Sequence, residues 1–214
     1  MPLMQFLLKY GDSIAPLIPL AAFLFNWKQV PRRVYIILGY LFISAFVYGY
    51  SNYLADRYIN NMYLYHIICL IEFLCISIYI LSLIKSRALK KIIFIQSAFF
   101  VAFFFSNLYW LEPINTLNSN SISLEFLLLI IACSFYFYEL TNSDTMLHFH
   151  KDGDFWIVSG FLFHFCSSFL TFALYKYTAK NNEFFMANFW NVQVILYIIR
   201  CIIISKGILC FRKI

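Results

Sequence analysis

Long apolar blocks dominate the sequence and limit what the chain can fold into. Each block has about 20 residues, enough for a helix to cross a hydrocarbon layer of about 30 Å at about 1.5 Å of rise per residue. We expect short connections between the blocks and no separate soluble domain. The predicted membrane helices are residues 10–27, 33–51, 62–84, 91–110, 121–139, 155–176 and 188–206.

The composition agrees with lipid as the solvent. Hydrophobic residues make up 63% of the chain and charged residues 12%, whereas soluble domains have roughly 45–50% and about 25%. A membrane β-barrel strand alternates polar and apolar residues, but the run IICLIEFLCISIYILSLI is apolar on all sides. The sequence therefore predicts an all-α polytopic membrane protein with residues 1–214 as one bundle of about seven transmembrane helices. We expect it in the plasma (bacterial inner) membrane, with the lipid bilayer as a partner.

Basic residues collect in alternate connections and predict the orientation. One side carries Lys28, Arg32, Arg33, Lys85, Arg87, Lys90, Lys91, Lys151, Lys206, Arg212 and Lys213. The other side carries only Lys9, Arg57, Lys176 and Lys180, and Arg200 is assigned to the inner end of the last helix. The positive-inside rule places the N-terminus outside and the C-terminus in the cytoplasm. Lipid headgroups are the nearest partners of these basic groups, so we expect no nucleic acid.

The first block is interrupted by Pro16 and Pro19, and no small-x-small cleavage site follows before Trp27. We interpret it as a retained helix rather than a signal peptide. Its uninterrupted apolar part is short, so Lys9 and Asp12 are expected at the outer interface. The first helix could also lie partly in that interface and leave six full spans.

Glu72 is the polar residue that most needs an explanation. It lies inside the block 62–84, where a central carboxylate opposes insertion by about 2.5–3.5 kcal/mol. Tyr65, Glu72 and Tyr79 recur every seven residues and share one helix face, which we expect to turn inward. The partners expected for Glu72 are His66 or His164, followed by Asn191 and Tyr65.

Other polar side chains map to the outer half of the membrane or near its midplane. Glu125 allows two interpretations, a first-turn carboxylate near a Ser121/Ser123 cap or a pocket residue. Gly160, His164, Ser167, Ser168 and Thr171 form a small polar stripe that indicates either close packing or a cavity lining. The candidate ligand or ion pocket residues are Glu72, His66, Tyr65, Asn107, Glu125, His164, Ser168, Asn191 and Gln193. They form either an outward-facing polar pocket or a structural hydrogen-bond network.

Two further groups favour structural interpretations. The segment LHFHKDGD contains His148, His150, Asp152 and Asp154, but its setting predicts a solvated turn rather than a metal site. The four tryptophans lie near helix ends, which is typical of the headgroup boundary and argues against a ligand cage. Six cysteines form no C-x-x-C pair, and we expect no disulfide framework, metal or cofactor.

Three motifs carry a resemblance to a known group: NNMYLYHIICLIEF, DFWIVSGFLFHF and the pair Trp190-Asn191. In these motifs and over most of its length the chain resembles a group of uncharacterised seven-helix integral membrane proteins from Bacteroidota-type genomes. The resemblance implies a seven-helix fold and no particular activity. A retinal protein is excluded, because residues 188–205 contain no lysine for a Schiff base.

The sequence favours a sensory or regulatory module that acts through a small-ligand or partner-protein site in its outer half. The partner would be a membrane or cytoplasmic protein. One alternative is a transporter or channel coupled through Glu72. Another is a membrane-embedded lipid-modifying enzyme in which Glu72, Glu125 and His66 supply acid–base chemistry. We expect that the protein is not an enzyme.

Overall fold

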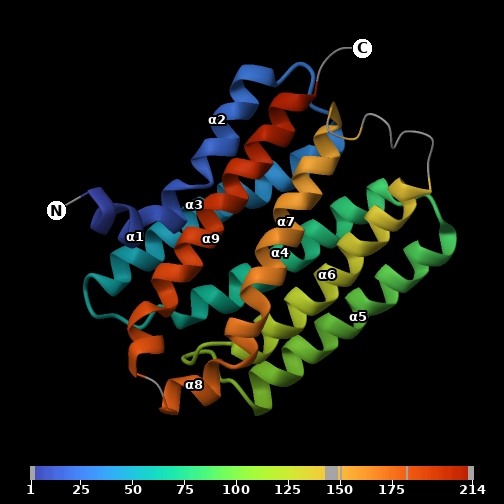
Figure 1. The fold of residues 1–214 in the computed structure, drawn as a ribbon. Helices are drawn as coiled ribbons and strands as arrows, with labels where there is room; N and C mark the ends of the chain where they lie inside the picture. The colour runs from blue at the N-terminus through green and yellow to red at the C-terminus, as the bar shows by residue number, and fades with distance from the viewer. Residues whose placement is uncertain (1–2, 143–148, 150, 182, 212–214) are drawn as a thin grey trace.

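A computed structural model describes residues 3–142, 149, 151–181 and 183–211, and these residues form a bundle of α-helices without a strand (Figure 1). One short 3₁₀ segment, η1, precedes α3. The elements are α1 Leu3–Ile14, α2 Leu17–Asn26, η1 Arg32–Val34, α3 Tyr35–Ala55, α4 Met62–Leu83, α5 Arg87–Trp110, α6 Ser119–Thr141, α7 Gly153–Ala173, α8 Tyr175–Asn181 and α9 Glu183–Cys210.

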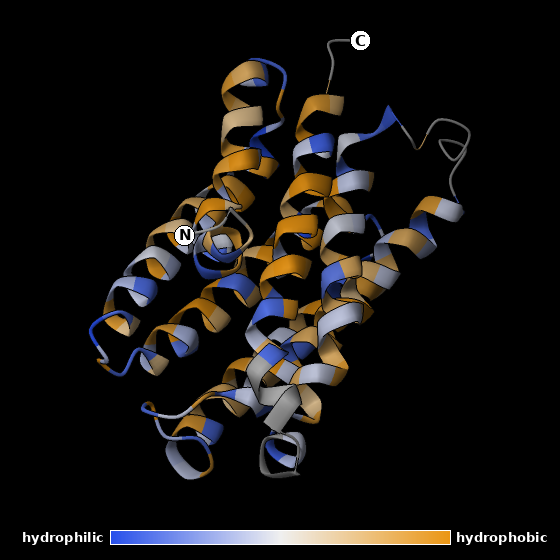
Figure 2. Cartoon of the chain, turned by 60° about the vertical axis from the view of Figure 1, so that its left-hand side comes forward, coloured by the Kyte–Doolittle hydropathy of each residue, from blue (hydrophilic) through white to orange (hydrophobic). Residues whose placement is uncertain are grey.

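Six helices of the described chain are long and apolar enough to cross a membrane, and a bent pair, α1 and α2, makes up to seven. The prediction of an all-α fold with six or seven helices able to span a membrane is therefore confirmed, and it is compatible with a multi-pass protein. Hydrophobic residues dominate the helices, while hydrophilic residues gather mainly at the connections (Figure 2). Large apolar side chains such as Phe46 and Phe94 point outward, 73% and 68% exposed, which suits contact with lipid rather than water.

The first predicted helix is broken rather than straight. Its two parts, α1 and α2, meet at an angle of 59°. Pro16 and Pro19 lack the backbone N–H that would continue the helix, and their rings clash with the preceding turn. The second part, α2, packs along α9, where Asn26 Nδ2 donates to the carbonyls of Ile208 and Phe211, both at 2.7 Å.

The most extensive helix contact joins α7 and α9, which lie side by side in Figure 1. Gly153 and Gly207 face each other there: a Cβ on Gly207 would stand 2.7 Å from the Gly153 carbonyl oxygen and 2.8 Å from Ile157 Cγ1. Small residues allow backbones to approach closely in membrane proteins. Helix α7 also packs against α6. Helix α4 packs against α3 and α6, whereas α5 lies at the edge against α4 and α6.

Ion pairs close the two ends of the bundle. At one end, Arg33 Nε donates to Asp154 Oδ2 at 3.1 Å, and Tyr79 OH donates to Asp154 Oδ1 at 2.7 Å. The solvated turn predicted for Asp154 is therefore wrong, because this carboxylate is buried and paired. Its neighbour Asp152 caps α7, and burial and the charge of Asp154 raise the pKa of Asp152. His148 and His150, named with them, lie outside the described residues.

At the opposite end, Glu112 organises the connection between α5 and α6. It accepts hydrogen bonds from Asn107 and Ser119 and pairs with Lys176 at 2.8 Å. Burial raises the pKa of Glu112, but the bonds from Lys176, Asn107 and Ser119 outweigh burial and lower it overall. Asn107, a predicted pocket residue, belongs to this end network, where it also bonds Ser121.

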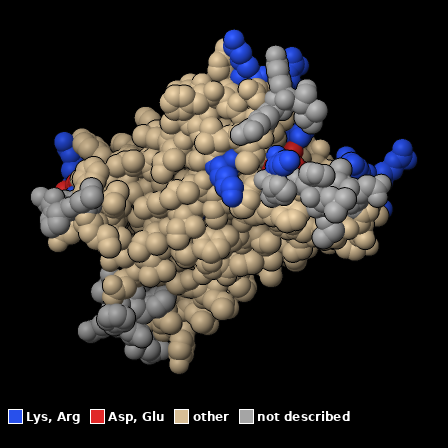
Figure 3. Space-filling view, turned by 45° about the horizontal axis from the view of Figure 1, so that its top comes forward, with Lys and Arg blue, Asp and Glu red and all other residues tan. Residues whose placement is uncertain are grey.

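Lysine and arginine side chains gather mainly toward the end that holds the C-terminus, as Figure 3 shows for one face. A broad area of this face below them carries no charged side chain, apart from the part covered by grey atoms. This pattern of charged ends around an apolar belt suits a bilayer.

Candidate functional site

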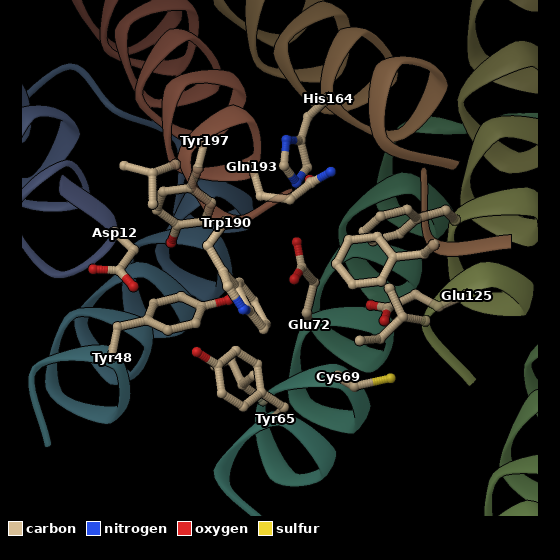
Figure 4. A pocket seen from close by; sticks show the side chains of 15 residues that line it. Asp12, Tyr48, Tyr65, Cys69, Glu72, Glu125, His164, Trp190, Gln193 and Tyr197 are labelled. Carbon is tan, nitrogen blue, oxygen red and sulfur yellow. The ribbon is translucent and has the colours of Figure 1, made fainter. Parts of the chain in front are cut away.

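A cavity of about 80 Å³ lies inside the bundle, lined by residues of α1, α3, α4, α6, α7 and α9. This volume holds several water molecules, since one needs roughly 10–15 Å³ by a comparable measure. Its strongly polar lining residues are Asp12, Glu72, Glu125, His164 and Gln193. Figure 4 shows Glu72 near the middle, between Asp12 on one side and Glu125 on the other. The cavity therefore combines polar groups from helices far apart in the sequence.

Glu72 forms a buried ion pair with Arg200. The guanidinium Nη1 contacts Glu72 Oε1, and Nη2 donates to Tyr40 OH at 2.6 Å. The ring of Tyr197 lies under the guanidinium, with 4.2 Å between the guanidinium carbon and the ring centre. Arg200 has no exposed surface and Glu72 is also buried. The ion pair and its hydrogen bonds compensate two charges that would each be unfavourable in lipid without a partner.

The predicted partners of Glu72 were therefore wrong. The carboxylate of Glu72 forms its ion pair with Arg200 and not with His66 or His164. The error came from placing Arg200 at the inner end of the last helix. Since α9 continues for ten residues beyond it, to Cys210, Arg200 lies near the middle of the span, level with the middle of α4. The inward face predicted from Tyr65, Glu72 and Tyr79 is confirmed for Glu72 and Tyr79, which are buried.

Glu125 differs from the other buried carboxylates. Among the described residues, four acidic side chains are buried, and Glu72, Glu112 and Asp154 each pair with a basic residue. Glu125 is 1% exposed, and its Oε1 has no hydrogen-bond partner among the described residues. The thiol of Cys69 bonds its carboxyl side chain. The first-turn interpretation of Glu125 is wrong, because α6 begins six residues earlier, at Ser119.

Two more cavity residues carry unpaired polar atoms. His164 hydrogen-bonds the backbone of Leu196, and its Nδ1 has no partner. The ring of His164 packs edge-on against Phe126 and Tyr197, at 5.7 and 5.9 Å between ring centres. Gln193 is also buried, and its Nε2 has no partner. Because Glu125, His164 and Gln193 all line the cavity, three unpaired polar groups border the same space.

Aromatic rings form one wall of the cavity. Tyr48 lies 5.5 Å from Tyr197 and 6.3 Å from Tyr65, and Tyr65 lies 5.3 Å from Trp190, all between ring centres. All four line the cavity, and Figure 4 shows Tyr48, Tyr65 and Trp190 close together. Trp190 therefore lines a cavity, although its position near a helix end had argued against a ligand cage.

The predicted pocket residues divide into two groups. Five of the nine line the cavity: Glu72, Tyr65, Glu125, His164 and Gln193. The other four, His66, Asn107, Ser168 and Asn191, are not part of the lining. His66 Nε2 lies 3.0 Å from the carbonyl oxygen of Thr116, and Ser168 is buried with no partner for its hydroxyl. Asn191 is half-buried on α9.

Sequence reasoning missed Asp12, Tyr48 and Trp190 as cavity residues. Asp12 was expected at the outer interface, but it lines the cavity and accepts a bond from Asn52 Nδ2 at 2.9 Å. The break between α1 and α2 moves Asp12 away from the position expected for a straight helix. Nothing in the sequence distinguishes Tyr48 from the other tyrosines, of which the chain has 16 in all.

The described residues hold no group of three or more His, Cys, Asp and Glu side chains suited to a metal ion. The apolar helices and the buried ion pair are compatible with a multi-pass α-helical membrane protein. The chain matches no protein-family model, no curated protein and no solved structure.

Proposed function

We propose that this protein takes a small ligand into the cavity and acts as a sensory or regulatory module of the membrane. The observation that carries the proposal is the set of unpaired polar groups of Glu125, His164 and Gln193 around one space. A buried polar group without a partner destabilises a fold by about 1–3 kcal/mol. A ligand that bonds all three groups recovers much of that free energy.

The same groups bear on the choice between an outward-facing pocket and a structural hydrogen-bond network. A purely structural network pairs its members, as Glu112 does with Asn107 and Ser119. The cavity-lining residues Glu125, His164 and Gln193 instead each keep one buried polar atom without a hydrogen-bond partner. This favours the pocket.

A transporter or channel is the second candidate, and Glu125 is the residue that favours it. Coupling needs a carboxylate that changes partner or protonation, and Glu72 is held by Arg200. Glu125 has no basic partner among the described residues, so we assign the coupling role to Glu125 instead of Glu72. The lipid enzyme has no comparable support, because His66 bonds a loop carbonyl away from the cavity.

The orientation and the bacterial inner membrane remain part of the proposal. They are supported by the basic connections at 28–33 and 85–91 and by the positive-inside rule. Membership in the seven-helix group of Bacteroidota-type genomes is likewise proposed, on the three motifs and the likeness over most of the chain.

Reporter fusions after residues 30, 58, 88, 116, 148 and 180 should alternate between cytoplasm and exterior, beginning in the cytoplasm. Alternation is expected because each intervening helix crosses the membrane once. Two successive fusions reporting the same side would contradict the topology. Cysteine labelling at the same positions in intact cells provides an independent measurement.

Filling the cavity should abolish ligand binding. Ile122 is buried and lines the cavity, whereas Ile131, on the same helix, is exposed. Ile122→Phe therefore fills the space, and Ile131→Phe serves as the matched control on the lipid side. The measurement is the thermal shift of the purified protein in detergent against small anions, neutral molecules and cations.

A ligand at about 100 times its Kd stabilises the protein by about 2.7 kcal/mol, roughly 5–10 °C in Tm for a chain of this size. Wild type and Ile131→Phe should show this shift with one ligand class, and Ile122→Phe should not. If no class shifts wild type, or if Ile122→Phe responds equally, the cavity is not a ligand site.

A further inference from the structure

The charged residues that line the cavity favour a ligand with one sign of charge. Its described lining includes three acidic residues, Asp12, Glu72 and Glu125, and neither lysine nor arginine. Arg200 pairs with Glu72 but is not part of the lining. Since Arg200 is used by Glu72, Asp12 and Glu125 have no basic partner among the described residues. An anion entering this space would meet carboxyl groups without a basic side chain to bind it.

The unpaired atoms specify hydrogen-bonding groups as well as charge. Glu125 Oε1 is an acceptor, and His164 Nδ1 is an acceptor when the other ring nitrogen donates to the Leu196 carbonyl. Gln193 Nε2 is a donor. A primary ammonium group has three N–H donors for the two acceptors, and an oxygen close to it in the same molecule can accept from Gln193.

The aromatic wall suits the same charge. The rings of Tyr48, Tyr65, Trp190 and Tyr197 border the cavity, and the electron-rich face of an aromatic ring attracts a cation. The guanidinium of Arg200 already uses Tyr197 in this way, 4.2 Å from the ring centre. The volume of about 80 Å³ limits the ligand to a few heavy atoms.

We infer that the cavity binds a small primary ammonium compound with an oxygen near its amine, which is the chemistry of an amino alcohol. The inference rests on the proposed ligand-binding function and names its ligand class. Glu125 and His164 accept hydrogen bonds from the ammonium, the aromatic wall faces the cation, and Gln193 donates to the oxygen.

Ethanolamine is the probe, measured by isothermal titration calorimetry with the full-length protein in nanodiscs. Two compounds of similar size change the charge: ethylene glycol removes it, and glycolate reverses it. Choline keeps the positive charge but loses the N–H donors and is larger. We expect ethanolamine to bind at least tenfold more tightly than each of them. Equal binding of ethylene glycol or glycolate would overturn the ammonium assignment.

Variants test the assigned roles in the same assay. Glu125→Gln should weaken ethanolamine binding at least tenfold, while Glu139→Gln, at the charged end away from the cavity, should not change it. Gln193→Leu should weaken ethanolamine binding but leave ethylamine, which lacks the oxygen, unchanged. Equal losses for the two amines would contradict the role of Gln193. The comparison of compounds on wild type stands even if a variant fails to fold.

The outcomes separate the two proposals. If a neutral or anionic compound binds and Ile122→Phe blocks it, the ligand site stands and the ammonium assignment fails. If no compound binds to wild type, the ammonium assignment fails, and the ligand site fails as well if the thermal-shift panel gives no response. Nanodiscs with and without phosphatidylethanolamine distinguish the source of the ammonium: weaker ethanolamine binding in its presence identifies a lipid headgroup, and unchanged binding identifies the free amine. Either result supports the ammonium chemistry.

Discussion

Replacing Arg200 with methionine should lower the free energy of unfolding by about 3–5 kcal/mol, because it leaves Glu72 buried without its cation. Methionine keeps much of the side-chain length, so the lost charge and hydrogen bonds dominate the effect. The bond to Tyr40 and the contact with the Tyr197 ring disappear together with the ion pair. Unfolding of the purified protein in mixed micelles gives the free energy directly.

The double variant Glu72→Met/Arg200→Met separates the ion pair from packing. Removing both charges should restore most of the stability lost in Arg200→Met, since a buried pair can often be replaced by apolar residues at little net loss. Arg87→Met, at the exposed start of α5, is the control and should change stability by less than about 0.5 kcal/mol. A double variant no more stable than Arg200→Met would contradict the pairing.

Gly207→Ala should destabilise the bundle by about 1–3 kcal/mol, the range for added bulk in a tightly packed site. The new Cβ would stand 2.7 Å from the Gly153 carbonyl oxygen and 3.0 Å from the Ile157 backbone nitrogen. Neither is the end of a flexible side chain, so α7 and α9 must move apart. Thermal unfolding in detergent measures the loss.

Gly39→Ala is the matched control with the opposite expected sign. No atom lies within 4 Å of the position of its Cβ, and Gly39 is exposed inside α3. Alanine is the better helix former, by about 0.8–1.0 kcal/mol. The two variants should therefore shift Tm in opposite directions. A shift of the same sign and size in both would show that α7 and α9 do not meet at these glycines.

The membrane helices were predictable because lipid imposes a simple rule on sequence. A span must be long and apolar, and the run at 62–84 satisfies this on every side and corresponds to α4, Met62–Leu83. The break in the first helix was less predictable in geometry. Pro16 and Pro19 indicate an interruption, but the angle of 59° depends on how α1 and α2 pack against α3 and α9.

The site was predictable in part, because a polar residue in lipid must face inward. This argument identified Glu72, Glu125, His164 and Gln193, all of which line the cavity. It did not identify which residues meet, because helix faces from distant parts of the chain are brought together only by packing. Arg200 carried a usable signal: a cation inside an apolar run needs an acidic partner, and Glu72 is the corresponding acid at mid-depth in α4.

The Glu72–Arg200 pair also has a consequence for how the protein is made. Glu72 is in α4 and Arg200 is in α9, so the ribosome completes the acidic helix long before the basic one. Until then α4 holds an acidic residue whose insertion is unfavourable by about 2.5–3.5 kcal/mol at mid-membrane. Docking of α9 converts two isolated polar groups into one neutral pair. A chain truncated before residue 200 therefore keeps an unsatisfied acid in the bilayer, which distinguishes an unfinished product from a complete one.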